Sequence, residues 1–223
     1  MLTLSEAVIP LHRTQVGLIE SGPIARRLGW HRLAFQTLGA DQKEGGVQDV
    51  APFARMEEIE PLLQEADFPP PPPRRELHRI PRRALLNWAL PWLLLAAAAA
   101  AAALRFDARV GFAAALLVLM SLIAVLRWRR HSWAIGDRAL TVSGGFLKRR
   151  TWIIPFEKAQ SISVSQGPVQ RRLSLATLLV DTAGAPLLRS PEIVDLDADD
   201  ANRLAAQLLA LFYRQRRRRA AAP

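Results

Sequence analysis

The residues that could support catalysis or bind a metal are few and scattered. Four histidines, His12, His31, His78 and His131, do not pair at metal-ligand spacing with one another or with a carboxylate cluster. The chain has no cysteine, which excludes disulfides, thiolate catalysis and cysteine metal sites. No glycine-rich phosphate loop or nucleophile-elbow motif is present. We therefore expect no metal, no cofactor and no enzymatic activity.

The acidic run DLDADD at 195–200 has two interpretations. Clustered carboxylates can bind a cation, but this run lacks the glycine and the distal glutamate of a calcium loop. Acidic residues also favour the start of a helix, where they cap free N–H groups and complement the helix dipole. The pattern favours a helix that begins here.

Basic clusters are the remaining candidates for binding. Anionic lipid or partner contacts are expected at Lys148, Arg149 and Arg150, and at Arg216, Arg217, Arg218 and Arg219. Near an anionic membrane each such residue contributes about 1 kcal/mol. The alternatives are a solvated turn for the first cluster and a solvated helix end for the second.

Charge is divided unevenly along the chain. Residues 1–68 carry 6 basic and 10 acidic residues, whereas residues 69–223 carry 24 basic and 10 acidic residues. The first part therefore has a net charge of −4 and the second a net charge of +14, which together give the +10 of the whole chain. This asymmetry fits a partner with anionic head groups.

Two uncharged stretches predict a membrane hairpin at 84–130. Residues 84–104 contain no charge, and residues 110–126, extended to Trp128, form a second apolar run. A helix needs about 20 apolar residues to cross a bilayer, so we expect transmembrane helices at 84–104 and 110–128. The connecting RFDAR is too polar for lipid and too short for a domain. The alternative is a pair of helices buried in a soluble core.

Arginines flank this hairpin on one side. Those before the first span are Arg74, Arg75, Arg79, Arg82 and Arg83, and those after the second are Arg127, Arg129 and Arg130. The turn carries only Arg105 and Arg109, offset by Asp107. The positive-inside rule predicts a multi-pass protein with both termini in the cytoplasm.

An internal repeat lies on either side of the hairpin. Residues 9–40 align without a gap with residues 154–185, and 12 of the 32 pairs are identical. The shared positions include Gly22 and Pro23, which recur as Gly167 and Pro168, and the Arg-Arg pair 26–27, which recurs as Arg171 and Arg172. The recurrence predicts a structural role for these residues, such as fixing a turn.

The second copy contains more of the repeated unit. It shows β-prone runs at 132–135, 139–143, 150–155, 161–166 and 178–181, a turn at 183–185, a continuation at 186–189 and then an amphipathic helix. We expect a complete domain at 131–215 and a basic tail at 216–223. The first copy, 1–68, has only the back half: about three strands and a helix near 50–65. Its half sheet leaves an edge open, which predicts either a fragment of a longer chain or completion by another chain.

Five consecutive prolines at 69–73 open a Pro/Arg-rich linker, 69–83. They favour a stiff polyproline II spacer. The alternative is a ligand for a proline-binding domain.

The pattern AIGDRALTVSGGFLKRRTWIIPFEKAQSISVSQGPVQRRLSLATLLVDTAG, with its closing helix, resembles the bacterial pleckstrin-homology (PH) domain of YdbS/YdbT-like membrane proteins. Ser174 stands where the family has glycine, and Gly29 keeps that glycine in the first copy. The resemblance implies seven antiparallel strands in a bent sheet, closed by a C-terminal helix, beside a hairpin in the bacterial inner membrane. It also implies that such units recur along a longer protein.

These observations predict a membrane-anchored binding or scaffold module that faces the cytoplasm. Its expected partners are the lipid bilayer, anionic lipid head groups, and another membrane protein or a second copy. One alternative is a basic nucleic-acid-binding membrane protein, although no exposed aromatic set for base stacking is visible. Another is a component of a membrane transport or envelope-stress complex, although the apolar runs 84–104 and 110–126 contain no ionisable residue.

Overall fold

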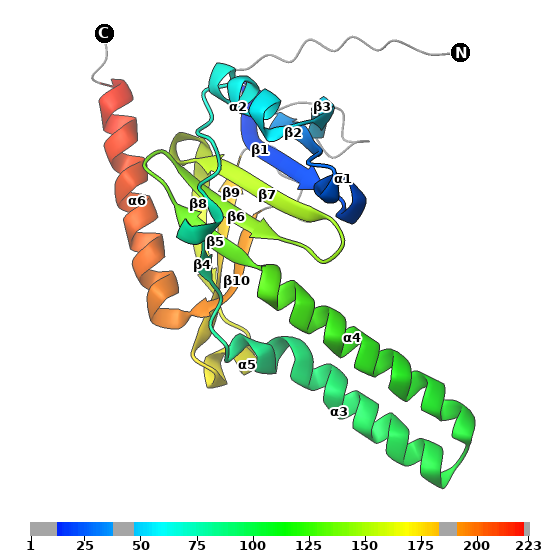
Figure 1. Ribbon diagram of the computed structural model, residues 1–223. Helices are drawn as coiled ribbons and strands as arrows, with labels where there is room; N and C mark the ends of the chain where they lie inside the picture. Colours follow the sequence, from blue (N-terminus) through cyan, green and yellow to red (C-terminus); the bar gives the residue numbers. More distant parts are fainter. Residues whose placement is uncertain (1–12, 38–46, 183–190, 221–223) are drawn as a thin grey trace.

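The computed structural model describes residues 13–37, 47–182 and 191–220, with side chains up to residue 214 (Figure 1). The strands are β1 (Thr14–Ser21), β2 (His31–Thr37), β3 (Val47–Ala54), β4 (His78–Arg79), β5 (Ser132–Ile135), β6 (Ala139–Gly144), β7 (Arg149–Pro155), β8 (Ala159–Ser165), β9 (Leu175–Thr182) and β10 (Glu192–Asp197). The helices are α1 (Pro23–Arg27), α2 (Met56–Glu65), α3 (Ala84–Arg105), α4 (Gly111–Arg130), α5 (Pro168–Arg172) and α6 (Ala198–Ala220). The turn expected at 183–185 and the continuation at 186–189 lie outside the described residues.

A seven-stranded antiparallel sheet joins the two halves of the chain. Its strand order is β3-β2-β1-β7-β6-β5-β4, and β8, β9 and β10 form a separate three-stranded sheet. Strand β1 pairs with β7, with Gly17 opposite Ile153. The half sheet of the first copy was expected to have an unpaired edge. This edge is instead paired with β7 of the same chain. Together with the hairpin and the C-terminal helix, this confirms the predicted PH-like fold class.

The hairpin is inserted between two paired strands. Strand β4 precedes α3, β5 follows α4, and the two pair with His78 opposite Trp133. Residues from 131 onward supply the six strands β5–β10, and β4 adds a short seventh from before the hairpin. Both ends of the hairpin are consequently held by the same sheet.

Helices α3 and α4 form the predicted hairpin. They are 22 and 20 residues long, and both helical segments are long and apolar enough to cross a membrane, with mean hydropathies of 1.7 and 2.3. Most of their side chains are exposed in the isolated chain, as expected for lipid-facing helices. Asp107 begins the reversal, because its carboxylate accepts a hydrogen bond from the Arg109 N–H at 2.8 Å.

The internal repeat is visible as repeated structure. Helices α1 and α5 match at the 145-residue offset, and each begins after a glycine with nearly the same backbone angles. Gly167 donates its N–H to Gln170 Oε1 at 2.8 Å, and Pro168 occupies the first helical position, where its missing N–H costs nothing. The Gly-Pro pair thus starts a short helix between two strands in both copies.

Strand β7 contributes to two cores with successive residues. Ile153 packs with Ile19, Phe35 and Ile59, under α2. Ile154 faces the opposite side and packs with the core between the two sheets and α6. Because side chains alternate along a strand, β7 is covered on both faces.

One expected boundary was wrong, at the start of the helix near 50–65. Residues 50–54 belong to β3, because this segment pairs with β2, and α2 begins only at Met56, where Glu58 caps the Arg55 N–H at 2.7 Å. The helix expected to begin at the acidic run 195–200 is confirmed, and the first residues of that run end strand β10. Asp195 lies in β10 and is fully buried, and α6 starts at Ala198.

Candidate functional site

A cavity lined mainly by arginines lies at the root of the hairpin. It has a volume of about 380 Å³. Six arginines line it and define the arginine cleft: Arg26, Arg74, Arg79, Arg129, Arg130 and Arg149. Leu77 and Ser132 complete the lining. The cleft therefore joins the N-terminal unit, the linker, the end of α4 and β7.

Each arginine reaches the cleft from the end of an element. Arg26 lies in the last turn of α1, and the pairing of Ser21 with Arg149 brings α1 beside the start of β7. Arg129 and Arg130 end α4, directly before β5. The linker supplies the other two, Arg74 and Arg79. Strand pairing and the hairpin root thus bring together residues that are far apart in the sequence.

The positive charge of the cleft is not neutralised by carboxylates. In the described part of the chain, none of the six arginines forms an ion pair with Asp or Glu. Arg149 Nε donates to Ser143 Oγ at 3.1 Å, and Arg130 donates to the Phe146 carbonyl. Donors of this kind remain available for an anion, because a guanidinium carries five N–H groups.

Burial and the neighbouring arginines both act on the pKa of Arg149. Burial lowers its pKa below the usual value for arginine, and the positive charges of Arg74, Arg26 and Arg130 lower it further. The same field affects His31, whose pKa is lowered by burial and then by Arg149 and Arg74. A bound anion would relieve this repulsion, since unlike charges at close range stabilise one another.

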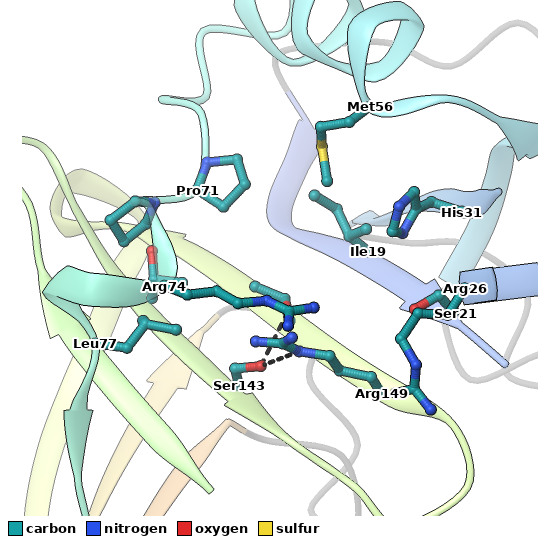
Figure 2. A pocket seen from close by; sticks show the side chains of 13 residues that line it. Ile19, Ser21, Arg26, His31, Met56, Pro71, Arg74, Leu77, Ser143 and Arg149 are labelled. Atoms are coloured by element: carbon teal, nitrogen blue, oxygen red, sulfur yellow. Dashed lines mark hydrogen bonds between the residues drawn. The ribbon is translucent and has the colours of Figure 1, made fainter. Parts of the chain in front are cut away.

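A smaller chamber of about 130 Å³ adjoins the cleft (Figure 2). It shares Arg26, Arg74 and Arg149 with the cleft, and Figure 2 shows the Arg74 and Arg149 side chains extending toward one another near Ser143. The rest of its lining mixes apolar side chains such as Met56 with hydroxyls. The chamber therefore extends the charged cavity toward α2 and the polyproline segment.

Comparison with known families identifies the fold that carries this cleft. Residues 86–212 match the family model described as Bacterial PH domain. The chain belongs to this family. The match confirms the resemblance drawn from the sequence, and it includes most of the hairpin as well as the strands that follow it.

A curated relative of this bacterial PH domain protein is the UPF0699 transmembrane protein YdbT of Bacillus subtilis (strain 168). The two are 21% identical over 201 residues, which cover 88% of this chain. The chain spans about 40% of the length of that relative. No solved structure matches the chain at a significant level. The relative's description and the two apolar helices support association with a membrane.

The basic residues singled out in the sequence are placed differently from one another. Arg149 lines the cleft. Lys148 is exposed in the turn before β7. Arg150 belongs to another contact, because its Nε donates to Glu20 Oε1 at 2.8 Å, and Glu20 also binds Arg32. Of the first basic cluster, only Arg149 is therefore part of this cavity.

The remaining predicted residues lie away from the cleft. Helix α6 runs away from the hairpin, so its backbone at Arg216, Arg217, Arg218 and Arg219 lies at the far end of the molecule (Figure 1). Arg171 and Arg172 are exposed in the last turn of α5, which begins after Gly167 with Pro168. Lipid contact by the α6 arginines, and a turn-fixing role for the α5 arginines, stay predictions.

Five of the six cleft arginines were not recognised from the sequence as one site. Arg74, Arg79, Arg129 and Arg130 were noted only for membrane orientation, and Arg26 only for its recurrence. The available signal was the density of arginine around the spans. What was missing was the β1–β7 pairing, which brings α1 to the root of the hairpin.

Proposed function

We propose that the chain is a membrane-anchored binding module that holds an anionic ligand in the arginine cleft and catalyses no reaction. One observation carries the proposal: six arginines from separate elements line one cavity, and none pairs with a carboxylate among the described residues. Assembling unpaired cations is unfavourable unless an anion joins them. Arginine also suits this role because its planar fork matches phosphate and carboxylate groups.

The composition of the cleft supports binding rather than chemistry. Neither the cleft nor the adjoining chamber is lined by a carboxylate or a tyrosine, and His31 lies only in the chamber. Within the described ranges, no three His, Cys, Asp or Glu residues gather as a metal site. Arginines that stay protonated can position an anion but serve poorly as general bases.

The orientation of the module is part of the proposal. We place both long ends, and therefore the cleft, on the cytoplasmic side of the bacterial inner membrane, because the arginines flank the hairpin at its root and are sparse at its turn. A scaffold role, with another membrane protein, a second copy or a transport or envelope-stress complex as partner, remains a prediction from the sequence.

Anion binding can be tested on the full chain in neutral detergent. Thermal unfolding is followed in inorganic phosphate and in sodium chloride at matched ionic strength. We expect phosphate to raise Tm by a few degrees, because a ligand that binds the folded state stabilises it. Arg149→Gln should remove most of this shift. Arg171→Gln, at the position that corresponds to Arg26 in the second copy, should keep it.

Two results would count against the proposal. Equal Tm values in phosphate and chloride would contradict anion binding in the cleft. Binding of duplex DNA by the wild type at physiological salt, lost in the Arg149→Gln variant, would support the nucleic-acid-binding alternative instead.

A further inference from the structure

We infer that the ligand of the arginine cleft is the phosphate group of an anionic phospholipid from the leaflet at the root of the hairpin. The inference rests on the proposed function and names its ligand. Three features of the molecule favour a lipid over a free phosphate compound: the depth of the cleft relative to the spans, the apolar side chains beside it, and its uncompensated charge.

The cleft lies at the level where phospholipid head groups are expected. Arg129 and Arg130 are the last two residues of α4, and they follow Trp128 directly. Trp128 is half-buried, and its Nε1 donates to the Pro81 carbonyl at 3.1 Å, which ties the end of one span to the start of the other. Tryptophan at the end of a span marks the interface between hydrocarbon and water. Arginines one or two residues further on therefore meet the phosphate layer.

Apolar side chains are exposed on elements that border the cleft. Ile24 and Leu28, on α1 and at its end, are 75% and 58% exposed, and Leu147 in the β6–β7 turn is 60% exposed. The bond from Arg130 to the Phe146 carbonyl holds this turn against the end of α4. Figure 1 shows α1 and the β6–β7 turn on the side of the sheets from which the hairpin leaves. Exposed apolar residues among arginines suit contact with a lipid surface, whereas a free anion in water would not contact them.

Charge selects the kind of lipid. A zwitterionic head group brings its own cation, which the arginines would repel. An anionic lipid brings phosphate without a compensating amine, so its charge is opposite to that of the cleft. Continuity with the membrane anchor also keeps the concentration of such a lipid high at the cleft, because the protein never leaves the bilayer.

The test compares lipid and free ligands on the full chain in neutral detergent. Short-chain phosphatidylglycerol, short-chain phosphatidylcholine and glycerol 3-phosphate are titrated separately, and binding is measured by the shift of Tm and by native mass spectrometry. We expect phosphatidylglycerol to bind at least about tenfold more tightly than either of the other two.

Variants locate the binding. Arg26→Gln and Arg149→Gln should each lower the affinity for phosphatidylglycerol by about fivefold. Leu147→Ser should lower the affinity for phosphatidylglycerol and leave the affinity for glycerol 3-phosphate unchanged. The matched controls lie on α5: Arg171→Gln and Val169→Ser, which correspond to Arg26 and Ile24 in the second copy, should keep wild-type affinity.

The outcomes separate this inference from the proposed function. Glycerol 3-phosphate that bound as tightly as phosphatidylglycerol would overturn the lipid inference and leave anion binding in place. Phosphatidylcholine that bound as tightly as phosphatidylglycerol would overturn the selection of an anionic lipid. If neither phosphatidylglycerol nor glycerol 3-phosphate bound, the inference and the proposed function would both be contradicted.

Discussion

Asn87 donates hydrogen bonds to both carboxylate oxygens of Asp195, at 3.0 and 2.9 Å, although the two residues lie 108 positions apart. Asn87 is in the first turns of α3, and Asp195 is a fully buried residue of β10 with a φ of +59°. Trp88 and Gln170 also donate to the same carboxylate. The strongly polar side chain that interrupts the first apolar span therefore joins the membrane helix to the three-stranded sheet.

Removing this bond should destabilise the protein. Asn87→Ala deprives a buried carboxylate of two hydrogen bonds, which costs about 1–3 kcal/mol, or several degrees in Tm. Thermal unfolding of the full chain in detergent measures the change. Leu94→Ala, on the same helix but 62% exposed, serves as the control and should change Tm much less. An unchanged Tm for Asn87→Ala would contradict a structural role of the pair.

The backbone at position 174 predicts a stabilising substitution. Ser174 has a φ of +51°, and its counterpart Gly29 has a φ of +74°, so both copies need the left-handed conformation. The Ser174 carbonyl accepts from the Ala198 N–H at 3.0 Å, which fixes this geometry at the start of α6. Because glycine adopts positive φ without a Cβ clash, Ser174→Gly should raise the free energy of unfolding by roughly 0.5–1 kcal/mol.

The reverse substitution and an ordinary strand position provide the comparison. Gly29→Ser should lower stability by a similar amount, and Ser165→Gly in β8 should also lower it, because glycine weakens a strand of normal geometry. Unfolding transitions of the three variants in one detergent test the argument. A Ser174→Gly variant less stable than wild type would show that the serine side chain contributes more than its backbone strain costs.

A buried histidine predicts a loss of stability in weak acid. Burial lowers the pKa of His131 from the usual 6.5 to about 4, and repulsion by Arg127 lowers it further while attraction to Asp195 opposes the shift. Its Nε2 accepts from the Val194 N–H at 3.3 Å, which requires the neutral ring. The unfolded state therefore binds the proton more readily. Stability is full above pH 6.5 and declines as the pH falls toward 4, by about 2 kcal/mol at pH 5.

The measurement is Tm between pH 7.5 and 5, for wild type and His131→Gln. The variant lacks the imidazole bond to Val194 at every pH. It also lacks the group that titrates, so its Tm should depend much less on pH between 7.5 and 5. The pKa of His31 is also lowered, so a smaller slope should remain. Parallel curves for the two proteins would contradict the assignment to His131.

Local patterns in the sequence predicted the elements but not their association. Strands β5, β6 and β7 follow short β-prone runs bounded by turn residues, so their limits agree with the expected ones within one residue. Strand β4 has only two residues and gives no pattern of its own. The pairing of Gly17 with Ile153 depends on tertiary contacts across the hairpin, and a local window holds no information about it. The arginine cleft was missed for the same reason, because its residues converge only after that pairing forms.

Membrane orientation can be tested with single cysteines, because the chain has none of its own. Ala108 lies in the turn between the spans, and Asp137 lies in the turn between β5 and β6; both are exposed. In intact bacteria, a membrane-impermeant maleimide should label Ala108→Cys and should label Asp137→Cys only after the inner membrane is opened. This follows from the excess of arginine at the root of the hairpin over its turn. The opposite labelling pattern would place the arginine cleft outside the cytoplasm, where the outer leaflet of the inner membrane would have to supply the proposed lipid.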